Sequence, residues 1–157
     1  MTLLNAELHI NVSILKENIC YLKTKIDKKS NFLAVVKANA YGHSLKKFVE
    51  KLDDCVDGYA LVRLDEALQV RDLSKKPILL MQGIYDDDEA LIAKRNGFMC
   101  VLHTQEQIRT YSRNLENKNI WLKVNTGMNR LGFSENVLND LNLLNIKPVS
   151  YTHLRAH

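Results

Sequence analysis

Two stretches of the sequence place basic and aromatic residues at the ends of apolar runs. In the first, AVVKANAYGH, residues 34–43, the apolar run ends at Lys37 and is followed by Tyr41 and Gly42. If the run is a buried strand, Lys37 stands at its carboxyl end, where parallel α/β folds carry their active sites. A lysine there loses hydration, which lowers its pKa and makes it a nucleophile toward carbonyl groups. The alternative is a lysine that extends past the strand into solvent.

The residues after Lys37 suit an anion. Tyr41 and Gly42 predict a tight turn before a helix, and both a tyrosine hydroxyl and a helix N-terminus can bind phosphate there. His43 could do the same or could simply begin the helix. The segment therefore combines a reactive amine with groups that hold a negative charge.

The second stretch is WLKVNTGMNRLGF, residues 121–133. Lys123 lies near the end of a predicted strand, and Gly127 and Gly132 allow the backbone to turn tightly or to approach a ligand. Arg130 is presented from this loop and could hold a cofactor oxygen through charge-assisted hydrogen bonds. The alternative for Arg130 is a solvated loop side chain.

The composition indicates one globular domain without a nucleic-acid surface. The chain has 157 residues, of which 46% are hydrophobic and 25% charged, and 22 basic against 18 acidic residues give a net charge of +4. The densest basic cluster, residues 23–29, is interrupted by Asp27 and is typical of a solvated helix end. We therefore expect no nucleic-acid partner.

Cysteine usage and hydropathy indicate a reducing, cytoplasmic location. Cys20, Cys55 and Cys100 are odd in number and widely spaced, which argues against disulfides and against a metal site. Cys20 and Cys100 lie among apolar residues and are expected in the core. No apolar run reaches the roughly 18 residues that a membrane span needs, and the first ten residues do not resemble a signal peptide.

Apolar periodicity predicts strands that alternate with helices. A first strand is expected at 7–12, followed by a helix capped by Ser13 with one apolar stripe, formed by Leu15, Ile19, Leu22 and Ile26. The run at 31–36 predicts a strand buried on both faces. Further strands are expected at 58–62, 77–81, 98–102, 120–124 and 147–152, and helices at 45–52, 65–73, 86–97, 104–115 and 134–144.

This alternation predicts an α/β fold with a parallel sheet, either doubly wound or a (β/α)8 barrel. No G-x-G-x-x-G follows the first strand of the repeat, which argues against a nucleotide-binding doubly wound sheet. A complete barrel takes about 250 residues and eight strands. The sequence therefore predicts a partial (β/α)8 TIM-type barrel with about six of the eight strands.

The two blocks together resemble the signature segments of the N-terminal domain of alanine racemases. That family uses pyridoxal 5'-phosphate (PLP), has fold type III and is built on a (β/α)8 barrel. The first block alone also resembles barrel-type amino-acid decarboxylases. The second block resembles alanine racemases only. The connecting stretch DEALQVRDLSKKPILLMQG, residues 65–83, is similar as well, and the resemblance covers residues 5–148.

The resemblance implies roles for individual residues. Lys37 matches the lysine that holds PLP covalently and then acts as the base on one face of the substrate Cα. Tyr41 matches a residue that contacts the cofactor phosphate, and Arg130 one that contacts the phenolic oxygen and lies near the substrate carboxylate. Lys123 matches a lysine that is often carbamylated and positions this arginine. The family often has Asp where this chain has Asn125, which leaves carbamylation open.

The resemblance also implies a domain division. Residues 1–148 match the N-terminal part of the barrel, whereas the family's C-terminal β-domain, which supplies a second tyrosine base across a dimer interface, is absent. In the tail, 149–157, Thr152, His153 and Leu154 match a family segment whose histidine packs on the cofactor ring, which makes His153 a cofactor-binding candidate. The sequence then departs from the family, which favours a tail that is not native.

The implied function is PLP-dependent interconversion of L-alanine and D-alanine for cell-wall peptidoglycan, by a homodimer. Two alternatives stay open from the first block: a non-catalytic PLP-binding barrel protein and a barrel-type amino-acid decarboxylase. The 157-residue chain alone is expected to be inactive and prone to aggregate, because an open barrel leaves strand edges unpaired.

Overall fold

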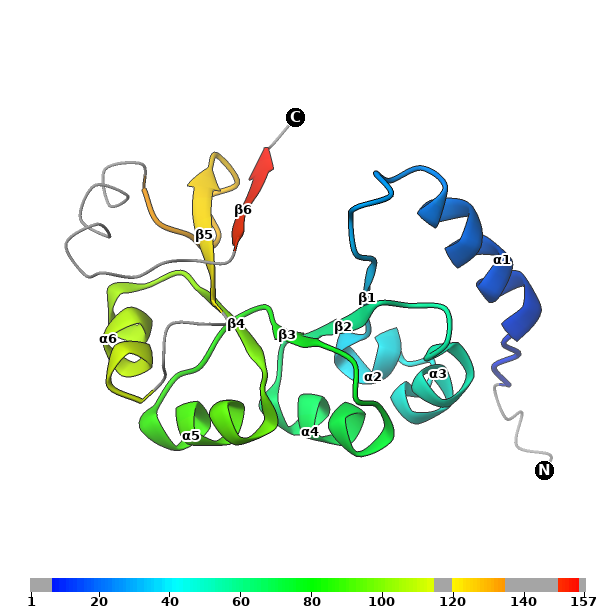
Figure 1. Ribbon diagram of the computed structural model, residues 1–157, viewed down its shortest axis with the longest axis horizontal. Helices are drawn as coiled ribbons and strands as arrows, with labels where there is room; N and C mark the ends of the chain where they lie inside the picture. The colour runs from blue at the N-terminus through cyan, green and yellow to red at the C-terminus, as the bar shows by residue number, and fades with distance from the viewer. Residues whose placement is uncertain (1–6, 115–119, 135–149, 156–157) are drawn as a thin grey trace, which may run out of the picture.

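Six parallel strands form one sheet, in the sequential order β1-β2-β3-β4-β5-β6 (Figure 1). The computed structural model describes residues 7–114 and 120–134, and residues 150–155 by their backbone. The strands are β1 (Leu33–Val35), β2 (Gly58–Leu61), β3 (Ile78–Leu80), β4 (Met99–Leu102), β5 (Ile120–Thr126) and β6 (Ser150–Arg155). Among these strands, β1 and β6 each have a single neighbour and are the edges of the sheet.

The helices that connect the strands lie along one side of the sheet. They are α2 (Lys37–Tyr41), α3 (Leu45–Leu52), α4 (Leu64–Leu73), α5 (Asp87–Asn96) and α6 (Gln105–Asn114), and a further helix, α1 (Val12–Lys23), precedes β1. Figure 1 shows α3 to α6 in a row along the convex side, with the strands above them and the opposite side open. Parallel strands joined by helices on one side are the geometry of a (β/α)8 barrel. The prediction of a partial barrel with six strands is confirmed.

Side chains on successive strand positions face opposite sides of the sheet. One set packs against the helices in the main core, including Tyr59, Leu61, Ile78 and Leu80, each at most 1% exposed. The other set, Ala60, Leu79 and Val101, forms a smaller cluster with Trp121 on the inner face. Val35, on β1, is 43% exposed. The prediction that residues 31–36 are buried on both faces is therefore wrong, because the described sheet does not close around its inner face.

The predicted helix ends are well illustrated by α5. Asp86 caps it, with Oδ1 accepting from the Glu89 N–H at 2.8 Å, and acids fill the first turn. Gly97 ends the helix at a φ of 64°, the left-handed conformation that glycine adopts without strain. Local sequence alone therefore sets both ends of this helix.

The N-terminal segment differs from its prediction. Residues 7–11 form no strand, since the alternating run has no neighbouring strand among the described residues, and Asn11 rather than Ser13 caps α1. Of the expected stripe, only Ile19 is buried, while Leu22 is 48% exposed. The helix is instead tied to the β1–β2 region by ion pairs, Lys16–Asp54 at 3.0 Å and Lys23–Asp57 at 2.9 Å.

Other expectations have mixed outcomes. Cys100 is buried as predicted, whereas Cys20 is exposed because the α1 face that carries it is not covered.

The last described strand begins at Ser150, three residues later than predicted, and the helix expected at 134–144 lies outside the described residues apart from Ser134. No described helix is long and apolar enough to cross a membrane. Within the described ranges, no cluster of three His, Cys, Asp or Glu side chains could hold a metal.

Candidate active site

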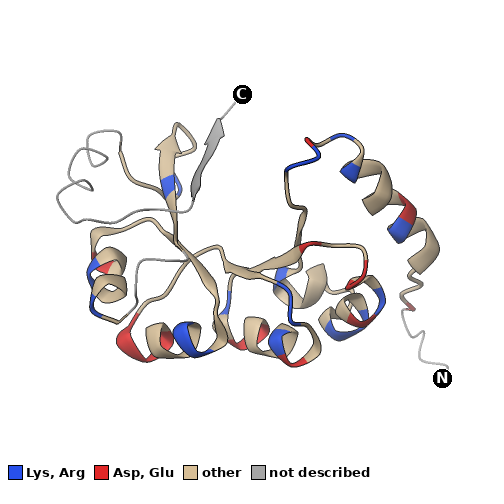
Figure 2. Cartoon of the chain, viewed as in Figure 1, with Lys and Arg blue, Asp and Glu red and all other residues tan. Residues whose placement is uncertain are grey.

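The carboxyl ends of the strands, here called the mouth, carry the chemically interesting residues. Lys37 follows β1 after one residue, His103 directly follows β4, and Lys123 lies within β5. The register of β4 and β5, in which Leu102 pairs with Leu122, places His103 and Lys123 at neighbouring positions. Figure 2 shows that charged residues lie mainly on the helices, and β5 carries a basic segment on an otherwise uncharged strand.

Lys37 begins a turn of unusual handedness. Ala38, Asn39 and Ala40 have φ of 52° to 54° and ψ of 46° to 53°, and Tyr41 has a φ of 54°. These are left-handed helical values, which cost L-residues about 1–2 kcal/mol each. The turn closes through Ala40 N–H to Val36 O at 2.9 Å and Gly42 N–H to Ala38 O at 3.0 Å. The tight turn predicted at Tyr41 and Gly42 therefore starts earlier, immediately after Lys37.

Side chains hold this left-handed turn. Glu66 Oε1, from α4, accepts from the Asn39 N–H at 2.8 Å. The Asn39 side chain in turn accepts from the Leu45 N–H at 2.8 Å, at the start of α3. His43 Nδ1 donates to the Ala40 carbonyl at 2.9 Å. His43 thus has a structural contact, and its suggested phosphate role stays a prediction.

The turn brings Lys37 and Tyr41 to the same side. Lys37 Nζ lies 6.0 Å from the centre of the Tyr41 ring, and Tyr41 is 57% exposed. A ligand at the mouth could therefore meet the Lys37 amine and the Tyr41 hydroxyl together.

Lys123 and Arg130 add positive charge to the same region. Burial lowers the pKa of Lys123, and the positive charges of Arg130 and Lys37 lower it further. Burial also lowers the pKa of His103, partly offset by its contact with Gln82, and the charge of Lys123 lowers it again. The lowered pKa of His103 favours its neutral form, while the basic side chains at the mouth would attract an anion.

The loop after β5 presents Arg130 by folding back onto its own strand. Phe133 N–H donates to Lys123 O and Asn125 N–H to Phe133 O, both at 2.8 Å. Asn125 Oδ1 accepts from the N–H groups of Gly127 at 3.1 Å and Asn129 at 3.0 Å. The Asn125 side-chain amide also donates to Asn129 Oδ1 at 2.9 Å. Asn125 is therefore the residue that shapes this loop.

Gly132 allows the close return of this loop. It has a φ of 125°, and a Cβ there would lie 2.6 Å from the Asn125 nitrogen and 2.9 Å from the Val124 carbonyl carbon. A side chain at this position would push the loop away from β5. The predicted role of Gly132 in a tight backbone approach fits this geometry.

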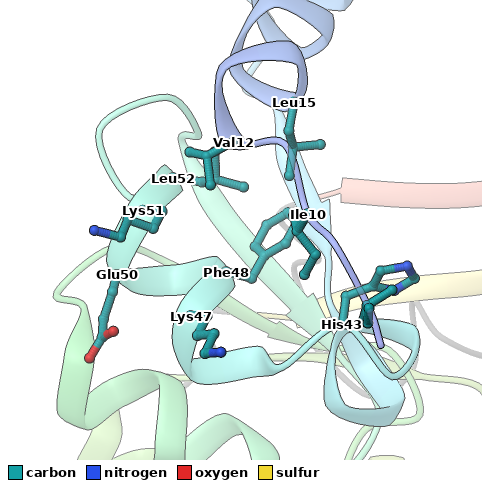
Figure 3. Close-up of a pocket in the computed structure, with 10 residues that line it drawn as sticks. Ile10, Val12, Leu15, His43, Lys47, Phe48, Glu50, Lys51 and Leu52 are labelled. Carbon is teal, nitrogen blue, oxygen red and sulfur yellow. The ribbon is translucent and has the colours of Figure 1, made fainter. Parts of the chain in front are cut away.

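A separate apolar hollow of about 390 Å³ lies between the N-terminal segment and α3. Figure 3 shows the apolar side chains of Ile10, Val12, Leu15, Phe48 and Leu52 gathered there, with Glu50 and Lys51 pointing away. His43 contributes to its edge, but Lys37, Lys123 and Arg130 do not line it. The hollow is therefore distinct from the mouth.

Two polar contacts near the mouth were not predicted. The sequence marks Glu66 only as part of a predicted helix, and its contact with Asn39 joins residues 27 apart in sequence. His103 Nε2 lies 3.2 Å from the Gln82 carbonyl, which also accepts from Gln107 Nε2 at 2.6 Å. A histidine directly after an apolar strand is a signal that could have suggested His103, whereas nothing local marks the target of Glu66.

Comparison with known proteins decides the family. Residues 10–150 match the family described as alanine racemase, N-terminal domain. The chain belongs to this family. An alanine racemase of Mannheimia succiniciproducens is 43% identical over 132 residues, which are 82% of this chain and 37% of that protein. An alanine racemase of Vesicomyosocius okutanii is 38% identical over 125 residues, 80% of this chain and 35% of that protein.

Solved structures agree with the fold of an alanine racemase N-terminal domain. The biosynthetic alanine racemase of Pseudomonas aeruginosa superposes with a TM-score of 0.80 at 30% identity, over 90% of this chain and 42% of that one. A histidine racemase of Leuconostoc mesenteroides gives 0.77 at 25% identity, over 93% and 42%. The chain thus spans little more than a third of the length of the curated relatives it matches.

The structure brings some of the predicted site residues together and does not describe the side chains of others. Lys37 and Tyr41 are brought together by the left-handed turn, and Lys123 is electrostatically coupled to Lys37 and Arg130. His153 pairs with Val124 in the β5–β6 register, but its side chain lies outside the described residues. Its cofactor contact and the foreign origin of residues 149–157 both stay predictions.

Proposed function

We propose that this chain forms the cofactor-binding part of an alanine racemase, which interconverts L-alanine and D-alanine with PLP. The observation that carries the proposal is the Lys37–Tyr41 turn at the mouth of a partial barrel, opposite the cations of β5 and its loop. The family match supports it, and a structure of the Bartonella henselae alanine racemase, similar in fold, is described with covalently bound pyridoxal phosphate.

The residues present fit PLP, which offers an aldehyde, a phenolic oxygen and a phosphate. Neither Lys37, Lys123 nor Arg130 forms an ion pair with any residue that the structure describes. Such cations are available for an anionic ligand. Lys37 would bond to the aldehyde carbon with loss of water, Tyr41 would donate to the phosphate, and Arg130 would donate to the phenolic oxygen.

In the proposed reaction, Lys37 has two tasks. It would anchor the cofactor, and as a free amine it would remove the Cα proton of alanine from one face. Bound PLP supplies an electron sink for the carbanionic charge left at Cα. Arg130 would orient the substrate carboxylate beside that centre. A proton returned to the opposite face inverts the configuration, so a second acid on that face is required.

Lys123 is a candidate for carbamylation. Its lowered pKa raises the fraction of neutral amine, the form that adds CO2 and loses one proton to become a carbamate. We therefore propose that Lys123 is carbamylated, and that the resulting anion pairs with Arg130 and fixes it.

Assembly is part of the proposal. The second base, a tyrosine in the family, would come from the partner subunit of a homodimer, and alanine would be the substrate. The D-alanine would be consumed in building peptidoglycan. The decarboxylase and non-catalytic alternatives are disfavoured because the chain also carries the second block, Lys123 to Gly132, which resembles alanine racemases, and because residues 10–150 match that family.

The test uses the full-length protein whose gene encodes this chain. It should interconvert alanine enantiomers, measured by chiral chromatography, and Lys37→Ala should lose this activity while Lys46→Ala, an exposed lysine of α3, keeps it. Carbon dioxide release instead of inversion would establish a decarboxylase. PLP binding without any turnover would establish a carrier, and racemisation retained in Lys37→Ala would refute the assignment.

A further inference from the structure

The carboxylate of Glu66 is buried but does not cap the helix that carries it. Glu66 is 8% exposed and is the third residue of α4, where a glutamate commonly accepts from the backbone N–H of the residue that caps the helix. That capping residue is Arg63, which forms no such bond to Glu66 in the structure. Its guanidinium pairs instead with Asp65, through bonds of 2.8 and 3.0 Å. Glu66 Oε1 reaches across to Asn39, at 2.8 Å.

Asn39 lies in the middle of the left-handed turn. Four consecutive L-residues, Ala38 to Tyr41, hold φ of 52° to 54°, a conformation that persists only where surrounding contacts over-determine it. The other hydrogen bonds of the turn come from within residues 36–45. Among the described residues, Glu66 is the one side chain from a different part of the chain that hydrogen-bonds to the turn.

The handedness and closure of the turn set the distance between its ends. A helical turn brings positions 37 and 41 back to the same side, as the 6.0 Å between Lys37 Nζ and the Tyr41 ring shows. An extended chain would separate the two Cα atoms by about 13 Å. Whatever keeps the turn closed therefore decides whether one ligand can meet Lys37 and Tyr41 together.

We propose that Glu66 is a positioning residue for the cofactor lysine. By accepting the Asn39 N–H, it fixes the left-handed turn, so that the Lys37 amine and the Tyr41 hydroxyl meet the two ends of one phosphate-bearing aldehyde. This inference rests on the proposed function, since it assigns Glu66 a part in the same PLP site. It adds a residue from α4 that touches neither cofactor nor substrate.

The experiment compares PLP with pyridoxal, which has the same aldehyde and lacks the phosphate. Each is added to the full-length protein, borohydride then supplies hydride to the carbon–nitrogen double bond that Lys37 has formed with loss of water, and peptide mass mapping counts linked Lys37. The ratio of the two half-maximal concentrations measures how well the turn presents Tyr41 while Lys37 reacts. A fold that is merely less stable loses both linkages together and keeps this ratio.

The variants separate hydrogen bonding from charge and from packing. Glu66→Gln keeps an acceptor oxygen at the same reach, so its ratio should stay within about two-fold of the parent. Glu66→Met removes the acceptor, and Glu66→Asp keeps the charge on a shorter side chain. Both should lower the preference for PLP on the order of ten-fold, the usual effect of losing a charge-assisted hydrogen bond. Val70→Ala, fully buried one turn further along α4, controls for loosening of that helix.

A glycine supplies a rescue. Ala38 is exposed and has a φ of 52°, so Ala38→Gly removes strain from the turn without removing a packed side chain. If Glu66 acts by holding a strained turn, adding Ala38→Gly to Glu66→Met should recover part of the lost PLP preference. Added to Val70→Ala, the glycine should leave the ratio unchanged.

The outcomes distinguish the positioning role of Glu66 from the binding of PLP at Lys37. A parent-like ratio in both Glu66→Met and Glu66→Asp, or the same ratio change in Val70→Ala, would overturn the role of Glu66 while leaving PLP binding intact. Failure of the parent protein to link PLP at Lys37 would instead overturn the proposed function. If Glu66→Met yields no folded protein, Glu66→Asp, measured alone and with Ala38→Gly added, decides the matter.

Discussion

Lys37 Nζ lies 6.0 Å from the centre of the Tyr41 ring, across a turn whose four residues after Lys37 are all left-handed. The amine and the phenol are thus displayed at the mouth on backbone that is costly to form. Strain of this kind is kept where a site needs a fixed geometry. The turn explains why an apolar strand leads so abruptly into a lysine and a run of small residues.

Two glycines of the loop after β5 form a matched pair for measuring a steric effect. Gly127 and Gly132 have φ of 122° and 125°, but only at Gly132 would a Cβ meet backbone of β5. Gly127→Ala should lower the free energy of unfolding by about 1–3 kcal/mol through strain alone. Gly132→Ala should cost about 1–3 kcal/mol more because of the overlap. Denaturant titrations of the two variants provide the comparison, and equal losses would show that the loop can move away from β5.

Asn125 is predicted to shape the loop that carries Arg130. Asn125→Ala removes two accepted backbone bonds and one donated bond, and should destabilise the protein by about 1–2 kcal/mol and weaken PLP binding. Asn125→Asp keeps acceptors for both backbone N–H groups and should retain most of the stability. Thermal unfolding and PLP titration measure both effects. Unchanged PLP affinity in Asn125→Ala would show that the position of Arg130 does not depend on the hydrogen bonds of Asn125.

Lys123 should leave a signature in the pH dependence of stability. Its pKa in the folded protein is below the ordinary value of 10.5, so between the two values the unfolded chain binds more protons than the folded one. The free energy of unfolding should therefore gain a positive contribution as pH rises through this window. Lys123→Met should remove that contribution and raise the melting temperature at neutral pH in CO2-free buffer.

The matched control for Lys123 is Lys46→Met, on the exposed face of α3. It should leave the alkaline slope of stability unchanged. If Lys123→Met shows the parent slope and the parent melting temperature, then the pKa of Lys123 is not lowered by its surroundings in the folded protein.

Much of the fold could be predicted from the sequence because the strands are short apolar runs between amphipathic helices. The run GYALV became β2, and DDDEALIAKRNG became α5 with its predicted start and end. The segment at 7–12 misled because alternation predicts a strand only if a neighbouring strand pairs with it. Whether such a neighbour exists is a property of the tertiary structure.

The site was predictable in its residue types and not in its geometry. Lys37 and Lys123 were marked by their positions at strand ends, yet their electrostatic coupling spans 86 positions of sequence and depends on the curvature of the sheet. The left-handed turn has no local signal apart from Asn39, since alanine and tyrosine avoid this conformation. Glu66, which stabilises the turn, lies on another element. Contacts of this range escape any reading of local pattern.

The central claim is that Lys37 is the residue that bonds the cofactor, and chemical trapping tests it most directly. The full-length protein is mixed with one equivalent of PLP, reduced with borohydride, digested and mapped by mass spectrometry. The account predicts one modified lysine, Lys37, and loss of this modification when excess alanine competes before reduction. Modification spread over exposed lysines such as Lys46, or concentrated at Lys123 with Lys37 unmodified, would contradict the account.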